Sequence, residues 1–230
     1  MKYYIALIVL LLSINITLSQ TPVEDQLGSW FTTSGTYTIS NKMSFSNTLQ
    51  SWHYKIADNF NFLFTSLAVN YRVSNKLTTS FAYGFMDIDS GFKKESAHTY
   101  ENRLMEQISY KHKLAKLPID HRFRVEQRFL NKPANNILLN RLRYRLGTKI
   151  KLNNALFIRL NNEFLVVVKT KDTDQFTENR AYAALGINIF KSANIQVGYL
   201  NRKIKGLDLH RLQLGLFYKI DLRKKNAIKQ

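Results

Sequence analysis

Charged residues occupy every second position in two successive runs between residues 120 and 151. They are Arg122, Arg124, Glu126 and Arg128 in the first run, and Arg141, Arg143 and Arg145 in the second. Guanidinium groups and carboxylates at such spacing form charge-assisted hydrogen bonds, and a surplus of arginine attracts anions. Because side chains two positions apart share one face of a strand, each run predicts a strand with an ionic face opposite an apolar one.

Groups suited to covalent or metal chemistry are scarce in this chain. Cysteine is absent, which excludes thiol chemistry and disulfides. The histidines share no motif and lack metal-ligand spacing; they are His53, His98, His112, His121 and His210. The best catalytic candidate is His121 with Ser109 or Asn140 on neighbouring strands, but a single strand histidine is usually structural. We therefore expect no catalytic residues, metal or cofactor, and keep a lipid hydrolase or acyltransferase of the outer membrane as an alternative.

The N-terminus predicts export. Lys2 precedes an apolar core from Ile5 to Leu12, which is too short to span a bilayer comfortably, and polar residues follow up to Ser19. We expect residues 1–19 to be a cleaved signal peptide and residues 20–230 to form a single domain, because no linker or composition break divides them.

The formal net charge of +18 indicates an anionic partner. Export argues against nucleic acid, so the expected partners are outer-membrane lipid and lipopolysaccharide, together with the barrel assembly machinery. Basic residues near predicted loops are placed to contact lipid phosphates, or serve only to keep the loops soluble: Lys93, Lys94, Lys132, Lys169, Lys171, Arg202, Lys203 and Lys205. Nothing in the sequence indicates an oligomeric state.

The periodicity predicts eleven strands, at residues 28–39, 42–54, 60–73, 76–88, 99–114, 119–130, 137–151, 155–168, 175–190, 194–202 and 209–222. Several are longer than ten residues, which favours tilted transmembrane strands over soluble ones, whose mean length is about five or six. The fold class is therefore all-β, an antiparallel up-and-down transmembrane-type β-barrel of 10 to 12 strands. The location that follows is the outer membrane.

The connections alternate between two classes. Tight turns are expected at Ser40–Lys42, Ser74–Lys76, Ala115–Pro118, Leu152–Asn154 and Lys191–Asn194. Longer links are expected at Lys55–Asn59, Asp87–His98, Asn131–Asn136, Lys169–Asp174 and Lys203–Asp208. Short turns are typical of the periplasmic end and long links of the extracellular end. Because bacterial barrels usually have an even strand number, the segment Leu27–Ile39 needs an unrecognised partner, an interior position or a periplasmic one.

Alternation alone does not say which face points outward. A secreted soluble lipocalin-like barrel would turn its apolar residues inward and its arginines outward. Strand length, alternating connections and the apolar face of the last strand favour the membrane arrangement. That face comprises Leu212, Leu214, Leu216, Tyr218, Ile220 and Leu222. Aromatic residues near predicted strand ends fit interfacial girdles: Trp30, Trp52, Tyr54, Tyr71, Tyr83, Tyr100, Tyr110, Tyr199 and Tyr218.

Three polar residues break the apolar face: Glu106, His121 and Gln127. Their expected positions are near an interface or beside a bulge that shifts the register.

Several spaced motifs resemble a known barrel family. They are Glu101-x-Arg103-x-x-Glu106-Gln107, His121-Arg122-x-Arg124-x-Glu126-x-Arg128-Phe129, Arg141-x-Arg143-x-Arg145, Asn162-Glu163 and Asn179-Arg180. In order and spacing they resemble the family catalogued as domain of unknown function 2490, over nearly the whole mature chain. The resemblance implies an outer-membrane or cell-envelope barrel and carries no substrate, cofactor or catalytic residue.

The polar faces of five consecutive strands predict a lumen charge network on one wall of the barrel. Its members are Glu101, Arg103, Gln107, Arg122, Arg124, Glu126, Arg128, Arg141, Arg143, Arg145, Arg159, Glu163, Glu178 and Arg180. Nine arginines face four glutamates in this set. The network is either a structural plug of ion pairs in an anchoring barrel or the lining of a narrow anion-attracting passage. The plug is the expected form, because small barrels fill their interiors with side chains.

Overall fold

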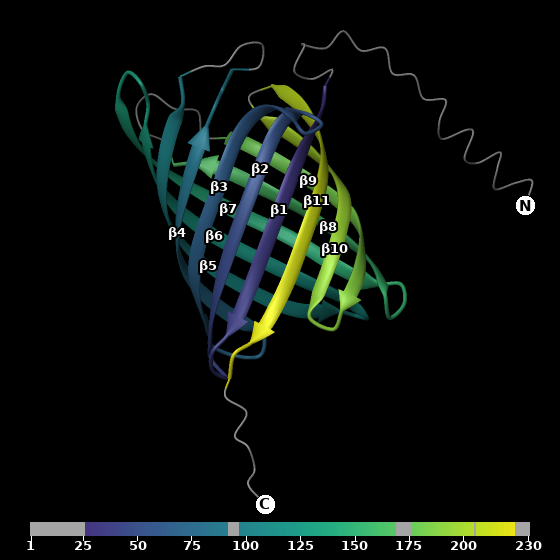
Figure 1. The fold of residues 1–230 in the computed structure, drawn as a ribbon. Helices are drawn as coiled ribbons and strands as arrows, with labels where there is room; N and C mark the ends of the chain where they lie inside the picture. The colour runs from purple at the N-terminus through teal and green to yellow at the C-terminus, as the bar shows by residue number, and fades with distance from the viewer. Residues whose placement is uncertain (1–25, 92–96, 169–175, 205, 224–230) are drawn as a thin grey trace, which may run out of the picture.

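The computed structural model describes residues 26–91, 97–168, 176–204 and 206–223, and these form a closed β-barrel (Figure 1). The barrel has eleven strands: β1 (Leu27–Thr38), β2 (Met43–Lys55), β3 (Asp58–Arg72), β4 (Leu77–Ile88), β5 (Thr99–Leu114), β6 (Leu117–Asn131), β7 (Asn136–Lys151), β8 (Leu156–Val167), β9 (Phe176–Phe190), β10 (Ala193–Ile204) and β11 (Leu207–Asp221). The predicted fold class is confirmed, and every predicted strand boundary lies within two residues of the observed one. In the described part of the chain, no helix is long and apolar enough to cross a bilayer.

The barrel closes through one parallel strand pair. β1 pairs antiparallel with β2 and parallel with β11, from Leu27 opposite His210 to Thr38 opposite Asp221. The two strands run side by side in the same direction in Figure 1. The expectation that Leu27–Ile39 needs an additional partner or a place outside the wall is therefore wrong. When successive strands alternate in direction and their number is odd, the first and last strands run in the same direction. Such a barrel closes only through a parallel pair, here β1 with β11.

Two of the expected long links are tight turns. Only Ile56 and Ala57 separate β2 from β3, and only residues 205 and 206 separate β10 from β11. Positive φ angles of 53° at Ala57 and 83° at Gly206 allow these sharp reversals. We call the end of the barrel that carries the β1–β2, β3–β4 and β5–β6 connections the turn end, and the opposite end the loop end.

The wall has an apolar exterior and a charged interior. Phe123, Leu142 and Leu214 are between 45% and 56% exposed on the outer face, whereas Glu101 and Glu126 are fully buried. This is the reverse of a soluble barrel, which buries its apolar side chains. It is the arrangement that a bilayer requires, because lipid contacts the outer face while closed pairing satisfies the backbone.

The aromatic residues divide between the two faces. Tyr71, Tyr83, Tyr100, Tyr110 and Tyr199 are between 41% and 49% exposed. Trp30 and Trp52, which we also expected in a girdle, instead lie in the interior core at 8% and 0% exposure. Alternation places their even-numbered positions on the inner side of β1 and β2.

The polar residues that interrupt the apolar face do not mark a bulge. β5 and β6 pair from Tyr100–Asn131 to Leu114–Leu117 without a register shift. His121 is instead held by its neighbours: its Nε2 lies 3.0 Å from His112 Nε2, and its Nδ1 lies 2.9 Å from the Tyr144 hydroxyl.

Candidate functional site: a cationic lumen

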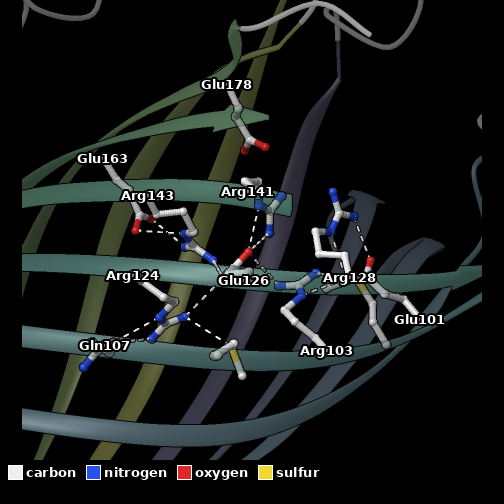
Figure 2. Close-up of polar contacts among 12 residues, drawn as sticks. Glu101, Arg103, Gln107, Arg124, Glu126, Arg128, Arg141, Arg143, Glu163 and Glu178 are labelled. Carbon is white, nitrogen blue, oxygen red and sulfur yellow. Dashed lines mark hydrogen bonds and ion pairs between the residues drawn. The ribbon is translucent and has the colours of Figure 1, made fainter. Parts of the chain in front are cut away.

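Five neighbouring strands, β5 to β9, carry the predicted lumen residues, and the structure places all of them on the inner face. The strand alternation decides this placement: odd positions of β5, β7 and β8 and even positions of β6 and β9 point inward. Cross-strand neighbours on the inner face then fall within reach of one another. Figure 2 shows ten of these side chains converging inside the barrel.

Glu126 is the centre of the network. It accepts hydrogen bonds from Arg141 Nε at 2.7 Å and from Arg143 Nη1 at 2.8 Å. Arg103 and Arg124 also lie within 3.7 Å and 3.6 Å of its carboxylate (Figure 2). A fully buried carboxylate remains ionised only if such partners replace its hydration, so four guanidinium groups around one glutamate explain how this charge is buried.

The other three glutamates each hold two arginines. Glu101 accepts from Arg103 Nε at 2.7 Å and from Arg128 Nε at 2.8 Å. Glu163 binds Arg143, at 2.7 Å from Nη2, and also Arg122. In this way each carboxylate joins two or more strands.

Glu178 and Asp120 extend the network towards the two ends. Glu178 pairs with Arg180 on its own strand and with Arg202 on β10. Asp120 lies 3.4 Å from Arg145 and 3.0 Å from Arg159. The remaining predicted member, Gln107, accepts from Arg124 Nε at 3.0 Å.

Sequence reasoning missed six charged residues of the interior: Lys111, Asp120, Lys149, Arg202, Arg211 and Lys219. Arg202 was expected at a lipid-facing loop, and the structure instead places it inside, paired with Glu178. The period of two does place these arginines on the polar faces of their strands, because Arg202 shares a face with Gln196 and Arg211 shares one with Gln213. A single arginine on an otherwise apolar strand gave too weak a pattern to be noticed.

The opposite wall is aromatic. Trp30 and Trp52 pack against each other with ring centroids 4.1 Å apart and ring planes tilted by 35°. The Trp52 ring lies under the guanidinium groups of Arg180 and Arg202 at 5.2 Å and 5.3 Å, so β2 contacts β9 and β10 across the interior. Arg180 and Arg202 therefore contact both the Glu178 carboxylate and the Trp52 ring, and the cation–π contacts add to their ion pairs.

The side chains do not fill the lumen. A cavity of about 900 Å³ is lined by residues near both ends, including Tyr54 and Ser90 at the loop end and Lys149 and Lys219 at the turn end. Thirteen arginines and lysines line this cavity, and five described carboxylates pair with members of this set, which leaves an excess of eight positive charges around the cavity.

The structure does not assemble the catalytic candidate. Ser109 lies on the inner face, where its Oγ accepts from Gln107 at 3.1 Å, whereas His121 lies on the outer face. Asn140 pairs with Gln127, six residues along β6 from His121. Over the described residues, no group of three or more histidine, aspartate or glutamate side chains is placed to hold a metal.

The basic residues near the loops contribute little to the described surface. Lys132 is exposed, and Lys203 is exposed with a 3.7 Å ion pair to Asp208. The others lie outside the described residues, as does the predicted signal peptide: Lys93, Lys94, Lys169, Lys171 and Lys205.

The chain is similar to one protein family and, at low sequence identity, to a solved structure. No curated protein matches the sequence. Among solved structures, the fold is similar to that of LpxR from Salmonella typhimurium, at 10% sequence identity and a TM-score of 0.43, over 77% of this chain and 83% of that one. The family model "Protein of unknown function (DUF2490)" matches residues 27–220, and the chain therefore belongs to this family.

Proposed function

We propose that this protein is an outer-membrane β-barrel whose lumen is a narrow, anion-attracting passage. The observation that carries the proposal is the excess of eight positive charges around a cavity that is lined from both ends of the barrel. An interior that is only a plug of ion pairs would need no more arginines than its carboxylates neutralise. The surplus attracts anions, because a low-dielectric wall focuses the field of the fixed charges into the lumen.

The apolar outer face supports the membrane location. Exposed leucine, isoleucine, valine and aromatic side chains occur on every strand. In water, such a surface would favour aggregation, whereas in a bilayer it is the surface that lipid contacts.

Conductance in planar bilayers tests the proposal. The refolded protein should give small current steps whose reversal potential in a KCl gradient shows selectivity for chloride. Lys111→Gln with Lys219→Gln should reduce this selectivity, because both lysines line the cavity.

Matched controls lie at the same end of the barrel. Lys76→Gln with Lys116→Gln removes the same charge from exposed turn residues outside the cavity lining and should leave the selectivity unchanged. Electrically silent bilayers that contain correctly folded barrel would overturn the passage and favour an anchoring barrel with a closed interior. Cation-selective steps would overturn it as well.

A further inference from the structure

Near the turn end, the lumen contains cations that the glutamates do not neutralise. Arg145 and Arg159 share one carboxylate, Asp120, at 3.4 Å and 3.0 Å. Lys149 places its Nζ 3.5 Å from the centroid of the Phe157 ring rather than against an acid. Arg145, Lys149 and Arg159 all line the cavity, so their charge is available to a bound molecule.

Like charges face each other directly in this region. Arg122 on β6 is the register partner of Arg145 on β7, and Lys149 on β7 is the register partner of Arg159 on β8. Like charges directly opposite on one face destabilise a strand pair. An anion bound between the two pairs would convert this repulsion into attraction.

Buried hydrogen-bond donors in the same region lack partners. Arg122 Nε, Arg145 Nε and the Tyr182 hydroxyl are buried without a hydrogen-bond partner among the described residues. Tyr182 is 8% exposed and lines the cavity, and its ring packs over Gly198, where a Cβ atom would come within 2.7 Å of it. Since Arg159 pairs with Ala184, Tyr182 is its diagonal neighbour on the inner face. Buried polar groups normally have partners, and these groups require an acceptor.

The strands opposite contribute neutral polar side chains to the cavity: Ser34, Thr48, Gln50, Gln196 and Gln213. Gly147 adds space between Arg145 and Lys149, because a Cβ atom there would lie 3.1 Å from Asp120 Oδ1 and 3.2 Å from Arg159 Nη2. The region therefore combines surplus positive charge, unpaired donors, neutral polar groups and open volume.

We propose that this half of the lumen is a binding site for a phosphate-class dianion, either free phosphate or a phosphate monoester. Arg145 and Arg159 donate to its oxygens, Tyr182 donates through its hydroxyl, and Lys149 supplies charge. Guanidinium groups match a tetrahedral oxyanion in charge and geometry and bind it bidentately, which a spherical halide does not permit. The neutral polar side chains opposite would contact the organic part of a monoester. The inference deepens the proposed function and rests on the lumen being accessible from the turn end.

Isothermal titration calorimetry tests the site on the refolded full chain in a zwitterionic detergent. Inorganic phosphate and glycerol 3-phosphate are titrated separately, at a pH where both are dianions and in the presence of chloride. Saturable binding of either supports the site. Tighter binding of glycerol 3-phosphate assigns it to an organic phosphate, and equal or weaker binding assigns it to the free ion.

Two variants locate the binding. Arg145→Gln with Arg159→Gln should weaken it by at least about tenfold, because each loses hydrogen bonds to a charged ligand. Tyr182→Phe removes only an unpartnered hydroxyl, so the barrel should fold normally while binding weakens by up to about tenfold. The Lys76→Gln with Lys116→Gln variant is the control for net charge and should bind as the wild type does.

Two results would overturn the site: no saturable binding of either phosphate by the wild type, or equal binding by the wild type and both lumen variants. Phosphate binding by a protein without conductance would keep the site and overturn the passage. Chloride-selective conductance without phosphate binding would do the reverse.

Discussion

Glu126→Gln is the substitution that tests most directly how the interior is stabilised. It keeps the shape of the side chain and removes the charge that four arginines share. Three of these arginines keep another partner: Arg103 has Glu101, Arg143 has Glu163 and Arg124 has Gln107. Arg141 makes its described ion pair with Glu126 alone and would be left as a buried, unneutralised cation.

The expected loss in the free energy of unfolding follows from this one stranded cation, Arg141. Removing one partner of a buried ion pair costs about 3–5 kcal/mol. The amide oxygen of glutamine is still able to accept one hydrogen bond, so we expect about 3 kcal/mol, the lower end of this range. The assay is a urea titration of the protein refolded in lipid vesicles, followed by tryptophan fluorescence and by heat-modifiable gel migration.

Two further variants complete the test of Glu126. Adding Arg141→Met to Glu126→Gln removes the stranded cation and should recover most of the lost stability, because the main cost of breaking a buried ion pair is the uncompensated charge that it leaves. Asp221→Asn removes an exposed partner of Arg223 and should leave the urea midpoint unchanged. An unchanged midpoint for Glu126→Gln, or no recovery in the double variant, would refute the reasoning.

Three other predictions address the wall and its packing. Leu214→Arg, in the middle of β11 on the outer face, should cost about 2–4 kcal/mol in vesicles, whereas Ile220→Arg near the strand end should cost about 0–1 kcal/mol; equal effects in urea titrations would contradict a bilayer around this strand. Gly186→Ala would place a Cβ atom 2.1 Å from the Phe157 ring and should lower the free energy of unfolding by about 1–3 kcal/mol in the same assay. Adding Phe157→Leu should relieve the clash and restore part of this loss; a double variant no more stable than Gly186→Ala would contradict the reasoning. The two tryptophans, Trp30 and Trp52, are the only ones in the chain and both lie in the interior, so brominated lipid tails should quench their fluorescence weakly; strong quenching, as expected for a Leu214→Trp control, would show that they face lipid.

The strands and the inner face of β5 to β9 were predictable because their pattern is local. Arg122, Arg124 and Glu126 share a face of any extended strand, whatever the rest of the chain does. The connections were less predictable: the polar residues of Lys55–Asn59 and Lys203–Asp208 looked like long links, yet positive φ angles at Ala57 and Gly206 reverse the chain within two residues. The aromatic girdle contains fewer residues than the sequence predicted, because a tryptophan near a strand end can lie on the inner face as well as on the outer one, and Trp30 and Trp52 lie on the inner face.

The sequence by itself determined the secondary structure, the ionic and apolar faces and the surplus of positive charge, since each depends on residue type and a period of two. Only the tertiary structure decided the parallel closure of β1 on β11, the sharing of Glu126 among four arginines and the stacking of Trp52 under Arg180 and Arg202. The physical reason is that barrel closure and contacts across the lumen depend on the register between strands that are far apart in the chain. Shifting a strand by two residues relative to its neighbour leaves the same side chains on the same face, so the alternation pattern does not determine the register.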